Sequence, residues 1–176
     1  MRPFPDLHRM QDDLRELFSQ YDPARPGGGK KAHAVELCRL VTLNSQVRDE
    51  VVYPWCAVRT SPELLQQSQI RMDLARVLVM ELAHGRPTDL WYDQLVQVLG
   101  DDLERLWDRE EPDAGLWSRT SDTRGLAGVN DRLGDRLTEL DLAGRQTDWR
   151  PLEPAGLETL RNSVPPGATP YAALSL

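Results

Sequence analysis

Five stretches of this chain carry apolar residues three and four positions apart, and this spacing constrains the fold more than any other feature. It follows the 3.6-residue turn of an α-helix, so each stretch predicts an amphipathic helix with one buried face. The predicted helices span about residues 7–20, 31–52, 62–84, 90–111 and 121–142. The alternation typical of strands does not occur. The sequence therefore predicts an all-α fold, with the first four helices packed as an up-down antiparallel four-helix bundle.

Capping and helix-breaking residues set the predicted boundaries. Asp6 is predicted to cap the first helix, and Pro54 and Gly85 to end the second and the third. Residues 25–29 include three glycines and predict a flexible connector. The fifth helix also holds three glycines, each costing about 1 kcal/mol relative to alanine. That helix is expected to depend on tertiary contacts.

The chain changes character at Gly144, where prolines begin to recur. We therefore predict a helical domain over residues 1–143, which includes the additional C-terminal helix. A Pro-rich tail over residues 144–176 follows it. The sequence leaves open whether this tail packs on the bundle.

Charge and length exclude several classes of function. The chain has 176 residues, 40% of them hydrophobic, and a net charge of -7. Such a charge argues against binding to nucleic acid, which requires a basic surface, and against binding to an anionic membrane. No stretch approaches the roughly 18 apolar residues of a membrane span, and the N-terminus lacks the apolar core of a signal peptide. We therefore expect a cytoplasmic protein with its two cysteines reduced.

Residues 36–55, ELCRLVTLNSQVRDEVVYPW, combine an apolar run, an acidic pair (Asp49-Glu50) and an aromatic-proline stop (Tyr53-Pro54). This segment resembles the second helix of hemerythrin-like (HHE cation-binding) domains. Segments 10–22, 69–82 and 95–112 resemble the other three helices, so the resemblance covers about residues 6–142. It implies a four-helix bundle. In that family, the first and third helices each give one histidine, and the second and fourth each give a His-x-x-x-Glu pair.

None of those ligand histidines is present at the matching positions. The i, i+4 spacing of each pair would bring both side chains to one metal, because such positions share a helix face. Alignment by the flanking residues places other residue types there: Gln11, Asn44 with Arg48, Met72, and Asp101 with Arg105, or Asp102 with Leu106 if the register shifts by one. An arginine cannot bind a metal, because its guanidinium stays protonated and has no acceptor. The resemblance thus implies a metal-free and cofactor-free member.

The first hypothesis is that the former metal cavity binds a small anionic or zwitterionic molecule. Arg48 and Arg105 would then hold a carboxylate, sulfate or phosphate. Asp101 or Asp102 would hold an amine or act as a general base in a tailoring enzyme of specialised metabolism. The remaining predicted ligand-binding residues are Gln11, Asn44, Met72 and His8, the last lying one turn before Gln11.

Two alternatives stay open at this point. In one, Asn44, Arg48, Asp101 and Arg105 satisfy one another inside a filled core, and the protein is a non-catalytic interaction or scaffold module. Such a module would form a homodimer or bind a partner protein. In the other, the protein is a metal-dependent oxygen or redox sensor. The sequence does not decide whether the protein is an enzyme.

Overall fold

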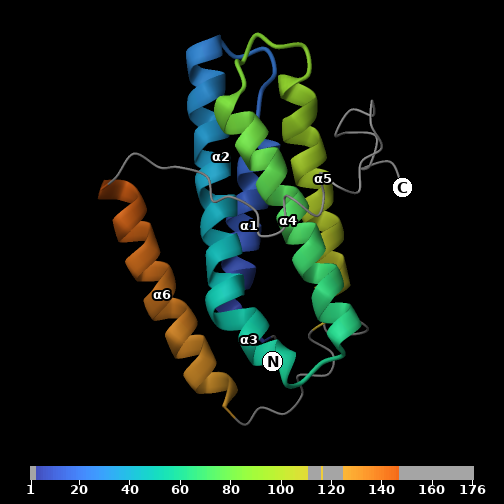
Figure 1. Ribbon diagram of the computed structural model, residues 1–176. Coiled ribbons are helices and arrows are strands. Elements are labelled where there is room, and N and C mark those ends of the chain that lie inside the picture. The colour runs from blue at the N-terminus through green and yellow to red at the C-terminus, as the bar shows by residue number, and fades with distance from the viewer. Residues whose placement is uncertain (1–2, 111–115, 117–124, 147–176) are drawn as a thin grey trace.

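The chain folds into helices (Figure 1), in a computed structural model that describes residues 3–110, 116 and 125–146. No described residue lies in a strand, so the predicted all-α class is confirmed. Two five-residue segments follow the second helix without a break, the π-helical η1 and the short α3. The elements are α1 (Pro5–Ser19), α2 (Gly27–Val47), η1 (Arg48–Val52), α3 (Tyr53–Ala57), α4 (Pro62–His84), α5 (Tyr92–Glu110) and α6 (Leu126–Gln146).

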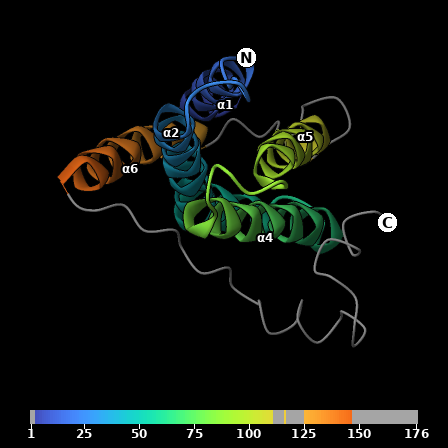
Figure 2. The ribbon, with the colours of Figure 1, turned by 90° about the horizontal axis from the view of Figure 1, so that it is seen from above.

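The main apolar core lies between α1, α2, α4 and α5. Each helix turns one stripe of apolar side chains inward, including Leu14, Val41, Leu78 and Leu103, all of them buried. Around this core α1 contacts α2 and α5, and α4 contacts α2 and α5. The view along the helices shows the same order around the centre (Figure 2). None of the described helices is sufficiently long and apolar to cross a membrane.

The additional C-terminal helix is present as α6, which packs on the side of α2 that lies away from α5 (Figure 2). Its buried residues Leu126, Val129 and Leu133 join a second apolar cluster near the start of α1 and the end of α2. The tertiary contacts on which this helix was expected to depend are therefore present. Residues 121–124 of the predicted helix lie outside the described residues. The helix runs to Gln146, past the predicted boundary at 143/144, and the rest of the tail is likewise outside the described residues.

Two predicted boundaries of the second helix are wrong. The helix begins at Gly27, so the glycines expected in a connector form its first turn. It also continues past Pro54, through η1 and α3 to Ala57. In η1 the Tyr53 N–H donates to the carbonyl of Arg48, a wider turn than that of an α-helix. This wide turn directly before Pro54 gives space to a residue that has no N–H and whose ring crowds the preceding turn.

The capping predictions have mixed outcomes. Asp6 does not cap α1: the helix begins at Pro5, after Phe4 in the left-handed conformation (φ 54°), and Asp6 instead pairs with Arg9. The prediction for α4 is confirmed at its C-terminus, because the helix ends at His84 and Gly85 is the capping residue.

Candidate binding sites

A buried ion pair joins the end of the second helix to the end of α5. Arg48, the first residue of η1, donates from Nη1 to the Oε2 atom of Glu110, and both side chains are 0% exposed. Arg48 Nε also donates to Asn44 Oδ1 at 2.7 Å, one turn earlier. The pair therefore ties two helices together at a point that water does not reach.

This ion pair is incompletely satisfied. Arg48 Nη2 and Glu110 Oε1 are buried and have no hydrogen-bond partner among the described residues. Burial raises the pKa of the Glu110 carboxyl, while the Arg48 charge acts in the opposite direction. The two charges consequently depend on each other, because neither has a full alternative set of partners.

The predicted ligand positions on α1, α2 and α4 do lie in the interior. Gln11, Asn44 and Met72 are buried. The Oε1 atom of Gln11 accepts from His8 Nδ1 at 3.1 Å, and Asn44 Nδ2 donates to Met10 Sδ at 3.3 Å. These polar groups are thus satisfied by neighbours on their own or adjacent helices.

The preferred register of the fourth helix is wrong. Asp101 and Arg105 are exposed on α5, and the residues that follow each of them, Asp102 and Leu106, are buried. A shift of one residue turns a helix by about 100°, which carries the predicted pair from the core to the surface. Asp102 Oδ1 accepts from Arg71 Nη1 of α4 at 2.5 Å, and burial raises the pKa of Asp102 despite this partner.

Sequence reasoning did not identify Glu110 as a core residue, because the run 108–111 is so strongly charged that it predicts a solvated helix end. A usable signal was present, since Leu99, Leu103, Leu106 and Glu110 follow one another at steps of four, three and four. That spacing places Glu110 on the apolar stripe of α5.

The donor set does not fit the metal centre that the hemerythrin resemblance would imply. The inward positions hold an amide at Gln11 and Asn44, a thioether at Met72, a guanidinium at Arg48 and a carboxylate at Asp102. Among the described residues, no three His, Cys, Asp or Glu side chains form a group that could hold a metal ion. A guanidinium at such a centre would repel a cation.

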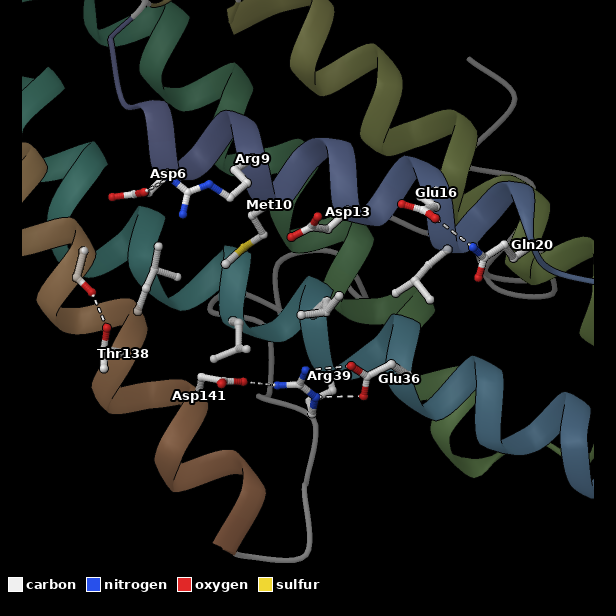
Figure 3. Close-up of a pocket in the computed structure, with 15 residues that line it drawn as sticks. Asp6, Arg9, Met10, Asp13, Glu16, Gln20, Glu36, Arg39, Thr138 and Asp141 are labelled. Atoms are coloured by element: carbon white, nitrogen blue, oxygen red, sulfur yellow. Dashed lines mark hydrogen bonds and ion pairs between the residues drawn. The ribbon is translucent and has the colours of Figure 1, made fainter.

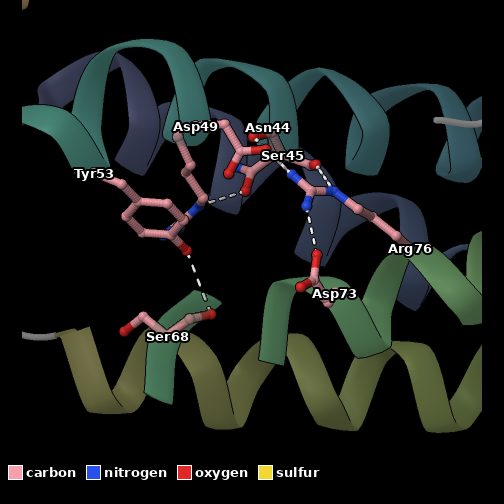
Figure 4. A network of polar contacts seen from close by, with 8 residues as sticks. Asn44, Ser45, Asp49, Tyr53, Ser68, Asp73 and Arg76 are labelled. Atoms are coloured by element: carbon pink, nitrogen blue, oxygen red, sulfur yellow. Dashed lines mark hydrogen bonds and ion pairs between the residues drawn. The ribbon is translucent and has the colours of Figure 1, made fainter. Parts of the chain in front are cut away.

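A second polar network opens to the surface between α4 and the end of the second helix (Figure 4). Arg76 is 8% exposed at its side chain and donates to Ser45 Oγ at 2.5 Å, to Asp73 Oδ1 at 2.6 Å and to Asp49. The side chains of Asp49 and Asp73 are 44% and 21% exposed. Burial raises the pKa of both carboxyls, against the effect of Arg76.

These three charged residues line a cleft of about 490 Å³, hereafter the Arg76 cleft. Its other walls are mostly apolar, formed by Tyr53, Pro54, Ala57 and Leu65, with Gln69. Every described nitrogen of the Arg76 guanidinium already donates within the protein, whereas Asp49 Oδ1 and Asp73 Oδ2 accept no hydrogen bond from the described residues.

A larger groove of about 800 Å³ lies between α1, α2 and α6, hereafter the α1–α6 groove (Figure 3). At one end α1 and α6 are in close contact, since a Cβ atom at Gly134 would lie 3.3 Å from Asp6 Oδ2. Toward its C-terminus α6 diverges from the other helices (Figure 1), so the two walls separate. The apolar residues that line the groove are Met10, Leu17, Leu40, Leu43 and Leu137.

Charged side chains surround this apolar lining. Arg39 of α2 pairs with Glu36 at 2.6 Å and with Asp141 of α6 at 2.8 Å, and so ties α6 to α2 (Figure 3). Asp13 and Glu16 of α1 are exposed and form no ion pair with the described residues. Among the described residues, five carboxylates and two guanidinium groups line the groove, leaving an excess of three negative charges.

Comparison with known proteins does not assign this chain to a family. No family model, no curated protein and no solved structure matches this chain. The features of the molecule that bear on its function are therefore the ion pair, the Arg76 cleft and the α1–α6 groove.

Proposed function

We propose that this protein is a non-catalytic interaction module, built on a metal-free hemerythrin-like bundle whose core is filled. The observation that carries the proposal is the Arg48–Glu110 ion pair, which joins η1 to α5 and is fully enclosed. The hypothesis of an anion site needed Arg48 and Arg105 to face one cavity. Arg48 is instead committed to Glu110, and Arg105 is on the surface.

Neither the Arg76 cleft nor the α1–α6 groove is lined by Gln11, Asn44, Arg48, Met72 or Asp102. The positions that would form a converted metal cavity thus contribute to neither recess. The larger recess lies on the surface along three helices, a shape suited to an elongated partner rather than to a compact metabolite. This favours recognition of a protein or peptide.

The proposal includes the finer architecture. An up-down antiparallel order is supported by the short connections between α1 and α2 and between α4 and α5, whose helices pack as neighbours. The hemerythrin-like assignment continues to rest on the sequence resemblance. A cytoplasmic location belongs to the same proposal.

Co-purification of the tagged full chain from the cells that naturally produce it tests the function. We expect a stoichiometric protein partner with the wild type and with the double variant Arg48→Met/Glu110→Met, whose folding is checked by circular dichroism. The double variant shows whether the buried ion pair only stabilises the fold or is also needed to bind the partner. Two results together would contradict the proposal: the wild-type chain purifies without a partner, and small anions stabilise it but not the double variant.

Elemental analysis of the same preparation tests the sensor alternative. Iron or another transition metal at near-stoichiometric occupancy would favour a metal-dependent oxygen or redox sensor over the interaction module.

The Arg76 cleft supports a second candidate function, binding of a small zwitterion or amine. Because Arg76 already donates to Ser45, Asp49 and Asp73, the available groups are the two free carboxylate oxygens beside apolar walls. Such a site favours an ammonium group on an apolar body. Thermal-shift measurements with amino acids and alkylamines test this, with Asp73→Asn as the variant expected to lose the shift.

A further inference from the structure

We propose that the α1–α6 groove is the docking site of the interaction module, and that its partner is a basic amphipathic helix. This inference depends on the proposed function and specifies the surface and the chemistry of the partner. Three properties of the groove carry it: its length, its apolar lining and its uncompensated negative charge.

The length of the groove fits a helix of about four turns. The lining residues of α1 and its C-cap run from Asp6 to Gln20 at steps of three and four, so they form one continuous face of the helix. At 1.5 Å per residue this face is about 21 Å long. A partner helix of about 14 residues would match it.

The apolar lining provides the contact surface for the partner. Leu17, Leu40 and Leu137 come from three different helices and are only half-buried, although they pack against the core. A partner that places leucine, methionine or phenylalanine over them would remove this surface from water, at about 25 cal/mol for each Å² buried. An amphipathic helix presents such residues along one face.

The negative charge of the groove favours a positively charged partner. Asp6 pairs with Arg9, and Glu36 and Asp141 pair with Arg39, which leaves Asp13 and Glu16 without a cation among the described residues. These two lie three positions apart on α1, so they face the same side. Lysine or arginine residues one turn apart on the partner would complement them.

The same charges argue against the two occupants that the chain itself provides. Residues 147–176 contain three acidic and two arginine residues, so this segment is not basic. A second copy of the chain carries a net charge of -7 and would be repelled at long range. A basic partner is therefore favoured over both the tail and a homodimer.

A binding measurement with a synthetic peptide tests the inference. The probe is a fluorescein-labelled helix of about four turns, with leucine on one face and lysine on the other, titrated with the full chain and followed by anisotropy. We expect Asp13→Asn/Glu16→Gln to weaken binding about fivefold, because two solvent-exposed charge pairs at the rim are lost. Leu40→Ala/Leu137→Ala, checked for folding by circular dichroism, should weaken it about tenfold or more.

The matched control is Glu81→Gln/Asp108→Asn, which removes the same net charge from exposed positions on α4 and α5 outside the groove. We expect its affinity to stay within twofold of the wild type. Equal weakening by this control and by Asp13→Asn/Glu16→Gln, or no binding of the peptide, would overturn the groove assignment. A natural partner captured equally by the wild type and by Asp13→Asn/Glu16→Gln would also overturn it and leave the proposed function standing.

Discussion

Two buried arginines in the described part of the chain meet carboxylates in opposite ways. Arg48 is completely enclosed with its partner, and each group has one atom without a hydrogen bond. Arg76 is nearly as buried, but donates to Ser45, Asp49 and Asp73, and the two carboxylates reach solvent. One network is closed and holds a single ion pair, whereas the other is open and holds two.

This difference separates structural charge from charge available for recognition. Taking two ions out of water costs more than their attraction returns unless each is well paired, so loss of one partner leaves a large penalty. Where the carboxylates remain in contact with water, hydration replaces a lost partner. The burial of the carboxylate, more than that of the arginine, should therefore decide how much stability each substitution removes.

The largest effect is expected at Glu110. Glu110→Gln removes the charge that balances Arg48 in an enclosed site, and we expect the free energy of unfolding to fall by about 3–5 kcal/mol. Chemical denaturation followed by circular dichroism measures this loss. A loss below about 1 kcal/mol would show that water reaches the pair.

The double variant Arg48→Met/Glu110→Met is the control for that measurement. It removes both charges and restores apolar volume, so its stability should lie well above that of Glu110→Gln. If the double variant is the less stable of the two, the cost comes from lost packing rather than from an unpaired charge.

Arg71→Gln should have a smaller effect that depends on pH. Asp102 is 8% exposed at its side chain, and burial raises its pKa although Arg71 is present. Without Arg71 the folded-state pKa rises further above the unfolded value, so the variant loses stability as the pH rises through that interval. We expect a loss of about 2 kcal/mol at pH 7, and little loss where Asp102 is protonated in both states. Chemical denaturation of wild type and variant at pH 7, and at an acidic pH where Asp102 is protonated, measures this loss. An equal loss of stability at the two pH values would show that the charge of Asp102 is not its cause.

Arg76→Met should cost about 1 kcal/mol, less than the loss at Glu110 although Arg76 is itself nearly buried. Asp49 and Asp73 keep access to water through the Arg76 cleft and need no replacement partner. Thermal or chemical denaturation at neutral pH measures the difference. A loss as large as that of Glu110→Gln would mean that the cleft does not hydrate its carboxylates.

Local patterns in the sequence were sufficient to predict the helices and many of their ends. The five apolar stripes and the stop at Gly85 follow from residues within one turn of each other, and all of these are present. The prediction that the second helix ends at Pro54 was wrong, because the wide turn of η1 accommodates a residue that normally ends a helix. That outcome depends on packing around the bend, which no local pattern contains.

The candidate sites depended on information that the sequence holds only indirectly. The partners of Arg48 and Arg76 are 62 and 27 residues away along the chain, at Glu110 and Asp49. The α1–α6 groove requires the placement of α6 against two helices that precede it by about 100 residues. Such pairings depend on how the helices pack, whereas the sequence predicts only which face of each helix is apolar.

The smallest effect is expected at the two positions first assigned to the site on α5. Asp101→Asn/Arg105→Gln changes two exposed side chains, which lie about 100° and 60° around the helix from the buried Asp102. Surface substitutions of this kind change the free energy of unfolding by about 0.5 kcal/mol or less. They should also leave peptide binding in the α1–α6 groove unchanged, because neither residue lines it. A large loss of stability would mean that α5 is rotated by one residue relative to the packing described above, and Arg105 would then compete with Arg71 for the carboxylate of the core.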